Sequence, residues 1–198
     1  MDLFKPRLFW ALPEALTASR CRRLVIWVDE EFQGSGLQLL QLKHLQELSL
    51  QGKHTIFDHP NFILPVEIGQ LRALRSLTLL NLPVTLPEWI AQLSELRDLT
   101  VRGTDLIHIP NWISQLKHLH SLHIGNCKLQ DVPETLQHMN NLRHLTFADI
   151  QLREIRPEQF PRHLKSLAFT GGGSYKTREV QELKHALRGT KIYCNNIL

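Results

Sequence analysis

The stretch that decides the fold is LPEWIAQLSELRDLTVRGTDLIHIPNWISQLKHLHSLHI, residues 86–124. It contains one phrase twice, beginning at Leu86 and again at Ile109, 23 residues later. Each copy opens on an apolar residue and proline, continues with apolar residues three places apart, and ends on the pattern LxxLxL. A phrase repeated at a fixed period is the signature of a repeat architecture.

The repeat extends well beyond these two copies. The LxxL tetrads begin at residues 74, 96, 119, 142 and 164, so that successive copies are 22, 23, 23 and 22 residues apart. The proline-containing phrase precedes four of them, beginning at Leu64, Leu86, Ile109 and Val132. Weaker copies are marked by Cys21, Leu24 and Ile26 and by Leu45, Leu48 and Leu50. Leucine accordingly makes up 37 of the 198 residues.

Each half of the phrase predicts one element. In LxxLxL the apolar residues at the fourth and sixth places alternate with polar ones, which predicts a half-buried strand. Apolar spacing of three after a proline predicts a short helical turn with one buried stripe. One repeat buries too few side chains to offset the entropy of ordering its backbone, so the units must stack into a solenoid with a parallel sheet.

The linked phrases resemble the leucine-rich repeat family, in its 22–24-residue LPxxIxxLxxLxxLxLxxNxL form. The resemblance implies an α/β fold: a right-handed horseshoe with a concave parallel sheet and helical turns on the convex side. The family's asparagine position is poorly kept, because it holds Thr104, Cys127 and Ile150. Asn81 and Asn126 stand one place early, so the register of this turn is left open by one residue.

We expect residues 1–198 to form a single domain, which suits this length. Residues 1–20 are expected to be an N-terminal cap or partial repeat, residues 21–170 the repeats, and residues 175–198 a cap of one helix and a strand over 191–194. A longer spacer, QGKHTIFDHPNF at residues 51–62, predicts a protruding bulge. Residues 170–174, TGGGS, break the repeat; they lack the Lys-Ser/Thr of a phosphate loop and are interpreted as a linker.

Composition narrows the function classes. The net charge of +4 is too small to indicate nucleic-acid binding, and no apolar run is long enough to cross a membrane. Three widely spaced cysteines form neither a disulfide framework nor a zinc motif, which favours a reducing compartment. The N-terminal MDLFKPRLFWALPEALTAS lacks a basic start and a long apolar core, so we predict no signal peptide. We expect a cytoplasmic protein, with secretion by a route without a cleaved leader as the alternative.

The polar places of each strand should face the concave side, where solenoid proteins usually bind their partners. From the third, fifth and seventh places of the tetrads we predict a partner-binding surface. Its residues are Trp27, Ser76, Thr78, Asp98, Thr100, Arg102, Ser121, His123, His144 and Thr146. The alternative is a solvated sheet face with no ligand.

The second place of each tetrad forms another column, which we call the basic ridge. It consists of Arg22, Gln46, Arg75, Arg97, His120, Arg143 and Lys165. Adjacent strands lie about 4.8 Å apart, so these cations form a positive line that would attract an acidic protein surface. The alternative is a solvated edge whose cations pair with nearby acids such as Glu95 or Asp98.

Two other groups of residues have weaker interpretations. Asp98, His123 and His144 lie on three successive strands and are of metal-ligand type, but single hydrogen bonds at the surface explain them better. Trp89 and Trp112 hold the same place in adjacent repeats and should stack on the convex side. There they either pack over the helical layer or form a second, aromatic contact surface.

Together these features predict a protein–protein interaction module that presents a rigid concave surface to a protein partner. It is expected to be monomeric, to need no cofactor, and to bind neither nucleic acid nor membranes. One alternative is a secreted effector or adaptor-type protein that targets a host or regulatory protein through the same face. The other is an enzyme, for which the sequence offers no catalytic site.

Overall fold

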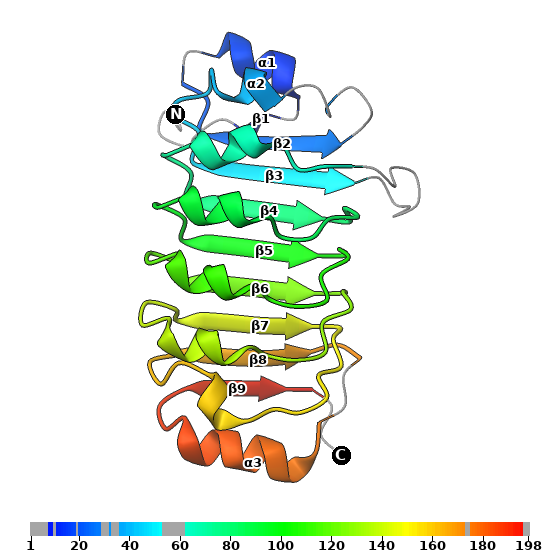
Figure 1. Ribbon diagram of the computed structural model, residues 1–198, viewed down its shortest axis with the longest axis vertical. Helices are drawn as coiled ribbons and strands as arrows, with labels where there is room; N and C mark the ends of the chain where they lie inside the picture. The colour runs from blue at the N-terminus through cyan, green and yellow to red at the C-terminus, as the bar shows by residue number, and fades with distance from the viewer. Residues whose placement is uncertain are drawn as a thin grey trace, which may run out of the picture.

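The computed structural model describes residues 8–9, 11–18, 20–28, 32, 36–52, 62–172 and 175–195. The strands of the described part form one parallel sheet in chain order, stacked along the long axis of the molecule (Figure 1). The strands are β1 Leu8–Phe9, β2 Arg23–Val28, β3 Glu47–Gly52, β4 Ser76–Leu80, β5 Asp98–Arg102, β6 Ser121–Gly125, β7 His144–Ala148, β8 Ser166–Thr170 and β9 Lys191–Cys194. The expected solenoid with a parallel sheet is confirmed, and β1 is an additional strand that no sequence pattern indicated.

Short helical segments precede most strands and lie over one face of the sheet (Figure 1). They are α1 Leu12–Thr17, α2 Gly36–Leu39, η2 Val66–Gln70, η3 Glu88–Gln92, η4 Asn111–Gln115, η5 Glu134–His138, η6 Pro157–Gln159 and α3 Thr177–Ala186. The turns within the clear repeats, η2 to η6, are 3-10 helices. In η3, for example, the Ile90 N–H donates to the Pro87 carbonyl at 3.1 Å. A single tight turn suffices because only one apolar side chain in it, such as Ile90, must reach the core.

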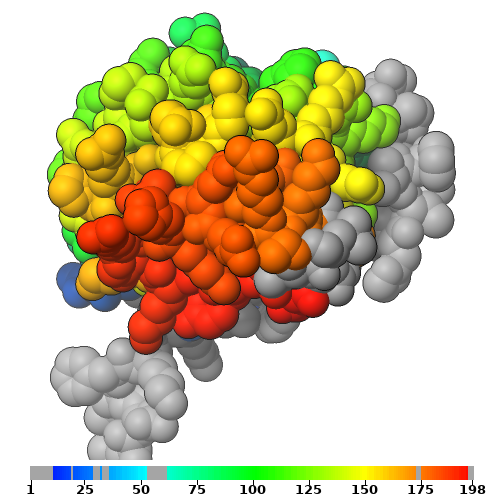
Figure 2. All heavy atoms as spheres, turned by 90° about the horizontal axis from the view of Figure 1, so that it is seen from below, coloured from blue at the N-terminus to red at the C-terminus, as the bar shows by residue number. Residues whose placement is uncertain are grey.

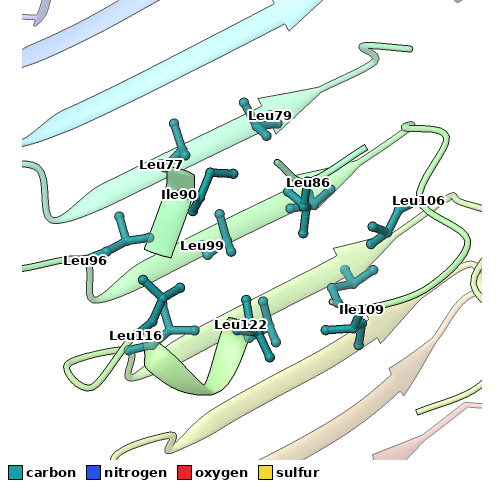
Figure 3. Packing of buried hydrophobic residues seen from close by; sticks show 14 of the residues in the cluster. Leu77, Leu79, Leu86, Ile90, Leu96, Leu99, Leu106, Ile109, Leu116 and Leu122 are labelled. Carbon is teal, nitrogen blue, oxygen red and sulfur yellow. The ribbon is translucent and has the colours of Figure 1, made fainter. Parts of the chain in front are cut away.

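The core is a continuous column of aliphatic side chains between the sheet and the helical turns. The strand register aligns leucines from one repeat to the next, so that Leu77 pairs with Leu99 and Leu99 with Leu122. Figure 3 shows these three side chains on the same side of their strands, with Ile90 facing them from η3. Leu77, Leu99 and Leu122 are each at most 1% exposed. The alternation that predicts a half-buried strand is therefore confirmed.

The residue directly after each of the five central strands has a positive φ angle. These residues are Asn81, Gly103, Asn126, Asp149 and Gly171. Glycine, asparagine and aspartate are the residues that adopt this left-handed conformation most readily. The open register question is thereby settled: the repeated Asn, Asp or Gly forms the turn itself, one place before the family's asparagine position.

The family's asparagine position holds apolar or weakly polar residues here. Leu82, Thr104 and Ile150 occupy it and are all buried, so no asparagine ladder runs through these turns. Thr104 is the polar residue of these three, and its hydroxyl oxygen Oγ1 is buried without a hydrogen-bond partner.

We expect Thr104→Val to raise the free energy of unfolding by about 1 kcal/mol, because an isosteric methyl group replaces an unsatisfied hydroxyl. Urea denaturation at unchanged m-value measures this difference. A loss of stability would show that the Thr104 hydroxyl has a partner in solution.

The C-terminal end of the stack is closed by α3 and β9. Figure 2 looks onto this end and shows the orange to red C-terminal residues lying across it. Tyr175 anchors the closure: its hydroxyl donates to the Ile150 carbonyl at 2.7 Å, and its ring centre lies 4.9 Å from that of Phe169. The strand expected over 191–194 is β9. The division of the chain into caps and repeats stays a prediction, and most of the expected bulge, residues 53–61, lies outside the described residues.

Candidate functional site

The third place of each tetrad forms a column of polar side chains on the open face of the sheet. The register pairs Ser76 with Asp98, Asp98 with Ser121, and Ser121 with His144, so the column crosses β4 to β7 without a break. Asp98 and His144 are exposed, whereas Ser76 and Ser121 are half-buried. Each side chain is therefore held about 4.8 Å from the next by main-chain hydrogen bonds.

A second column, from the fifth place, runs parallel to the first. It contains Thr78, Thr100, His123 and Thr146, all of them half-buried. Three threonine hydroxyls around one imidazole make this strip a set of hydrogen-bonding groups that can both donate and accept.

His123 is the unusual member of this strip. Its Nε2 atom is buried and has no hydrogen-bond partner. Burial lowers the pKa of the His123 imidazole below its ordinary value, and the nearby Arg102 cation acts in the same direction. Both effects favour the neutral form of the ring, which can both donate and accept a hydrogen bond.

The sequence places Arg102 between Leu80 and Gly125 of the adjacent strands and predicts that the glycine leaves room for a partner's side chain. The strand register confirms both neighbours of Arg102, which lies at the end of β5. The expectation about the glycine is wrong. A Cβ atom at Gly125 would lie 3.1 Å from Arg102 Nε and 2.9 Å from the Ala148 carbonyl oxygen, so Arg102 itself fills the space. The lack of a side chain at Gly125 lets the Arg102 side chain extend across β6 toward Asp149.

The guanidinium already faces a carboxylate of the same chain. Arg102 Nη2 lies 3.4 Å from Asp149 Oδ2, two repeats further on, and the other carboxylate oxygen accepts from the Gly172 N–H at 3.3 Å. Both side chains are more than two-fifths exposed, so this ion pair is weak and leaves Arg102 open to a partner. The sequence analysis did not identify Asp149 as a functional residue. The feature that could have indicated it is its position directly after a strand, where the other repeats have asparagine or glycine with a positive φ angle.

The seventh-place column is less open than predicted. Gly125 and Ala148 are buried, not exposed, because the small residues here are covered by their neighbours. Trp27, at the N-terminal end of the same column, pairs with Gln51 and is 42% exposed. The large exposed groups of this column therefore lie apart, with Trp27 on β2 and Arg102 on β5.

The metal interpretation finds no support in the geometry. His144 Nδ1 lies 2.8 Å from Ser166 Oγ, and the register places Ser121 between His144 and Asp98. Desolvation on the sheet face raises the pKa of the Asp98 carboxyl above its ordinary value, while the nearby His120 and Arg97 act in the opposite direction. Within the described ranges, no three His, Cys, Asp or Glu side chains converge as a metal site would require.

The basic ridge lies along the edge of the sheet where the strands begin. Arg75, Arg97, His120 and Lys165 are exposed, and each directly precedes a strand. In the described part of the chain, no ridge residue takes part in an ion pair with Glu95, Asp98 or another acid. The ridge side chains are therefore not held in salt bridges, although the Asp98 carboxyl is near enough to interact with the charges of Arg97 and His120.

Trp89 and Trp112 lie on the helical side, in η3 and η4. Both are half-buried and pack against the core. Gly69 of the preceding turn makes room for Trp89, since a Cβ atom there would lie 3.3 Å from the indole ring and 3.1 Å from the Trp89 carbonyl oxygen. This contact favours packing over the helical layer as the role of Trp89.

These features define a class: a repeat solenoid whose open sheet face presents ordered polar columns. A family profile described as a leucine-rich repeat region matches residues 20–169. The chain belongs to the leucine-rich repeat family. The search against curated proteins gives no significant match.

Solved structures share the fold. A leucine-rich repeat protein of Leptospira interrogans is 27% identical with a TM-score of 0.70, and the match covers 96% of this chain and 54% of that one. An internalin of Listeria monocytogenes is 16% identical with a TM-score of 0.63, covering 90% and 49%. The plant peptide hormone receptor RGFR1, solved in complex with RGF2, is 22% identical with a TM-score of 0.52, covering 87% and 31%.

The chain thus spans about half the length of the bacterial proteins that it matches. In the described part of the chain, no helix has the length and apolar character needed to span a membrane.

Proposed function

We propose that this protein is a non-enzymatic binding module that holds a protein partner on the open face of its sheet, across β4 to β7. One observation carries the proposal. Two adjacent columns of hydroxyl, imidazole and carboxylate groups follow an unbroken parallel register, from Ser76 and Thr78 to His144 and Thr146.

The rigidity of this face favours binding. Each side chain of the fifth-place column is flanked along its strand by buried leucine, valine, isoleucine or phenylalanine, such as Leu99 and Val101 around Thr100. A partner that docks here orders little of the chain, so less of the interaction free energy is lost to conformational entropy. The plant receptor of the same fold was solved in complex with RGF2, which supports a binding role for this chain.

Arg102 is the side chain expected to contribute most. It combines a large exposed surface with a planar donor group that can hold a carboxylate through two hydrogen bonds, and arginine is enriched among residues that dominate interfaces. The weak pairing with Asp149 keeps the guanidinium oriented across the face before a partner arrives.

The test is affinity capture from the native lysate, followed by calorimetry with the captured protein. We expect Arg102→Ala to raise the Kd at least about 30-fold, equivalent to about 2 kcal/mol. The melting temperature should change little, because Arg102 is exposed and its ion pair is weak.

Trp89→Ala is the control for the opposite surface and should leave the Kd within about threefold. A partner whose binding is lost with Trp89→Ala but kept with Arg102→Ala would contradict the proposal and place the site on the convex side. A monomeric state and a cytoplasmic location remain predictions alongside it.

A further inference from the structure

We propose that the basic ridge is a second contact surface, which binds an extended acidic segment of the protein partner. The ridge runs along the rim of the sheet through Arg22, Arg75, Arg97, His120, Arg143 and Lys165. The inference deepens the proposed function and rests on it, since it concerns a neighbouring part of the same partner.

The ridge is a rigid line. Its residues are joined by main-chain hydrogen bonds: the Arg97 N–H donates to the Arg75 carbonyl at 2.8 Å, and the His120 N–H donates to the Arg97 carbonyl at 2.7 Å. The same bonds continue through Arg143 to Lys165, at 2.8 and 2.7 Å. The sheet pairing therefore begins one residue before each strand, and it fixes the origin of every ridge side chain.

The charge at this rim is compensated only in part: the Asp98 carboxyl interacts with Arg97 and His120, and no ion pair of a ridge residue is found among the described residues. Two further cations in the preceding turns donate to main-chain carbonyls and not to carboxylates: Arg72 Nη1 to Gln92 O at 2.8 Å and Lys117 Nζ to Ser114 O at 2.9 Å. Lys43 and Arg162 hold corresponding places in other repeats and are exposed. The rim thus carries at least one fixed cation in each repeat from β3 to β8.

Cations away from the ridge have acidic partners. Just beyond the strand ends, Lys128 Nζ lies 3.1 Å from Asp105 Oδ1. At the helical turns η5 and η6, Arg156 approaches both Glu134 and Glu154. Lys128 and Arg156 are thus paired with acids, whereas the ridge cations in the described part of the chain form no ion pair. A localised row of unpaired charge attracts a polyanion and sets its direction of approach.

The dimensions suit an extended peptide. From Arg22, which precedes β2, to Lys165, which precedes β8, there are six strand-to-strand steps of about 4.8 Å, or about 29 Å in all. An extended chain advances about 3.4 Å per residue, so about nine residues cover the ridge. Because the two spacings do not match, acidic composition and not a defined motif should determine binding.

Two observations favour a protein segment over other polyanions. The ridge contains no Phe, Tyr or Trp on which nucleic-acid bases would stack, and no apolar side chain that would enter a lipid surface. The ridge also adjoins the proposed binding face directly, because Arg75 and Arg97 are followed in the chain by Ser76 and Asp98. One protein partner can therefore contact both surfaces.

The experiment measures binding of a synthetic ten-residue peptide of alternating Glu and Asp, with its Gln and Asn counterpart as control. The ridge variant combines Arg75→Gln, Arg97→Gln and Lys165→Gln. A matched variant, Lys128→Gln, Arg153→Gln and Arg156→Gln, removes the same number of positive charges from positions away from the ridge. Melting temperatures verify that both variants are folded.

We expect the acidic peptide to bind the wild-type chain and the Gln and Asn counterpart not to bind. The acidic peptide should bind more weakly at about 200 mM than at about 50 mM salt. The ridge variant should lose about tenfold or more in affinity, whereas the matched variant stays within about twofold. Absence of peptide binding, or equal losses in both variants, would overturn the inference.

Preferential binding of an oligonucleotide or of anionic lipid vesicles, lost in the ridge variant, would also overturn it, because the ridge would then serve another polyanion. The experiments can contradict the ridge proposal without contradicting the proposed binding face. If Arg102→Ala weakens the captured partner and the ridge variant does not, the binding face stands and the ridge assignment is wrong.

Discussion

Leu122→Ala should lower the free energy of unfolding by about 2–5 kcal/mol. Leu122 is 1% exposed and lies between Leu99 and Leu145 in the column of leucines that runs through the sheet. Truncation removes buried methyl groups and leaves a cavity that the repeats on either side cannot close without changing their register. Equilibrium denaturation in guanidinium chloride, followed by far-UV circular dichroism, measures the change.

His120→Ala is the control in the same repeat. Its side chain is exposed, so the free energy of unfolding should change by less than about 0.5 kcal/mol. Similar effects of the two substitutions would mean that buried and exposed side chains do not alternate along this part of the chain.

Gly103→Val should destabilise the fold by about 2–4 kcal/mol. Gly103 has a φ of 62°, a conformation that a β-branched residue adopts only under strain. A Cβ atom there would also collide with the Asn81 side chain of the preceding repeat and lie 3.2 Å from the Asn81 Cα atom. The substitution therefore disturbs the turn and the contact between two repeats together. Thermal unfolding by calorimetry gives the difference.

Gly172→Val provides the comparison, since no atom lies within 4 Å of a Cβ placed at Gly172. It should change stability by less than about 0.5 kcal/mol. A Gly103 substitution that proved as mild would show that this turn relaxes to a negative φ angle.

Several features of the site were predictable because they follow from periodicity. Once the tetrads are aligned, every residue of a parallel strand has a defined neighbour, so the columns from Ser76 to His144 and from Thr78 to Thr146 could be written down correctly. The basic ridge followed in the same way. Alternation along a strand decides which face a side chain takes, and it acts locally.

The sequence by itself therefore determined the solenoid, the strand register and the set of residues on the open face. Tertiary structure alone decided what those residues contact. Arg102 fills the space above Gly125 and faces Asp149, which is 47 residues away in the chain. Tertiary structure also decided that, among the described residues, the ridge cations form no ion pair, and that Gly125 and Ala148 are buried. Such contacts depend on side-chain conformations and on atoms from several repeats at once, which a one-dimensional period does not specify.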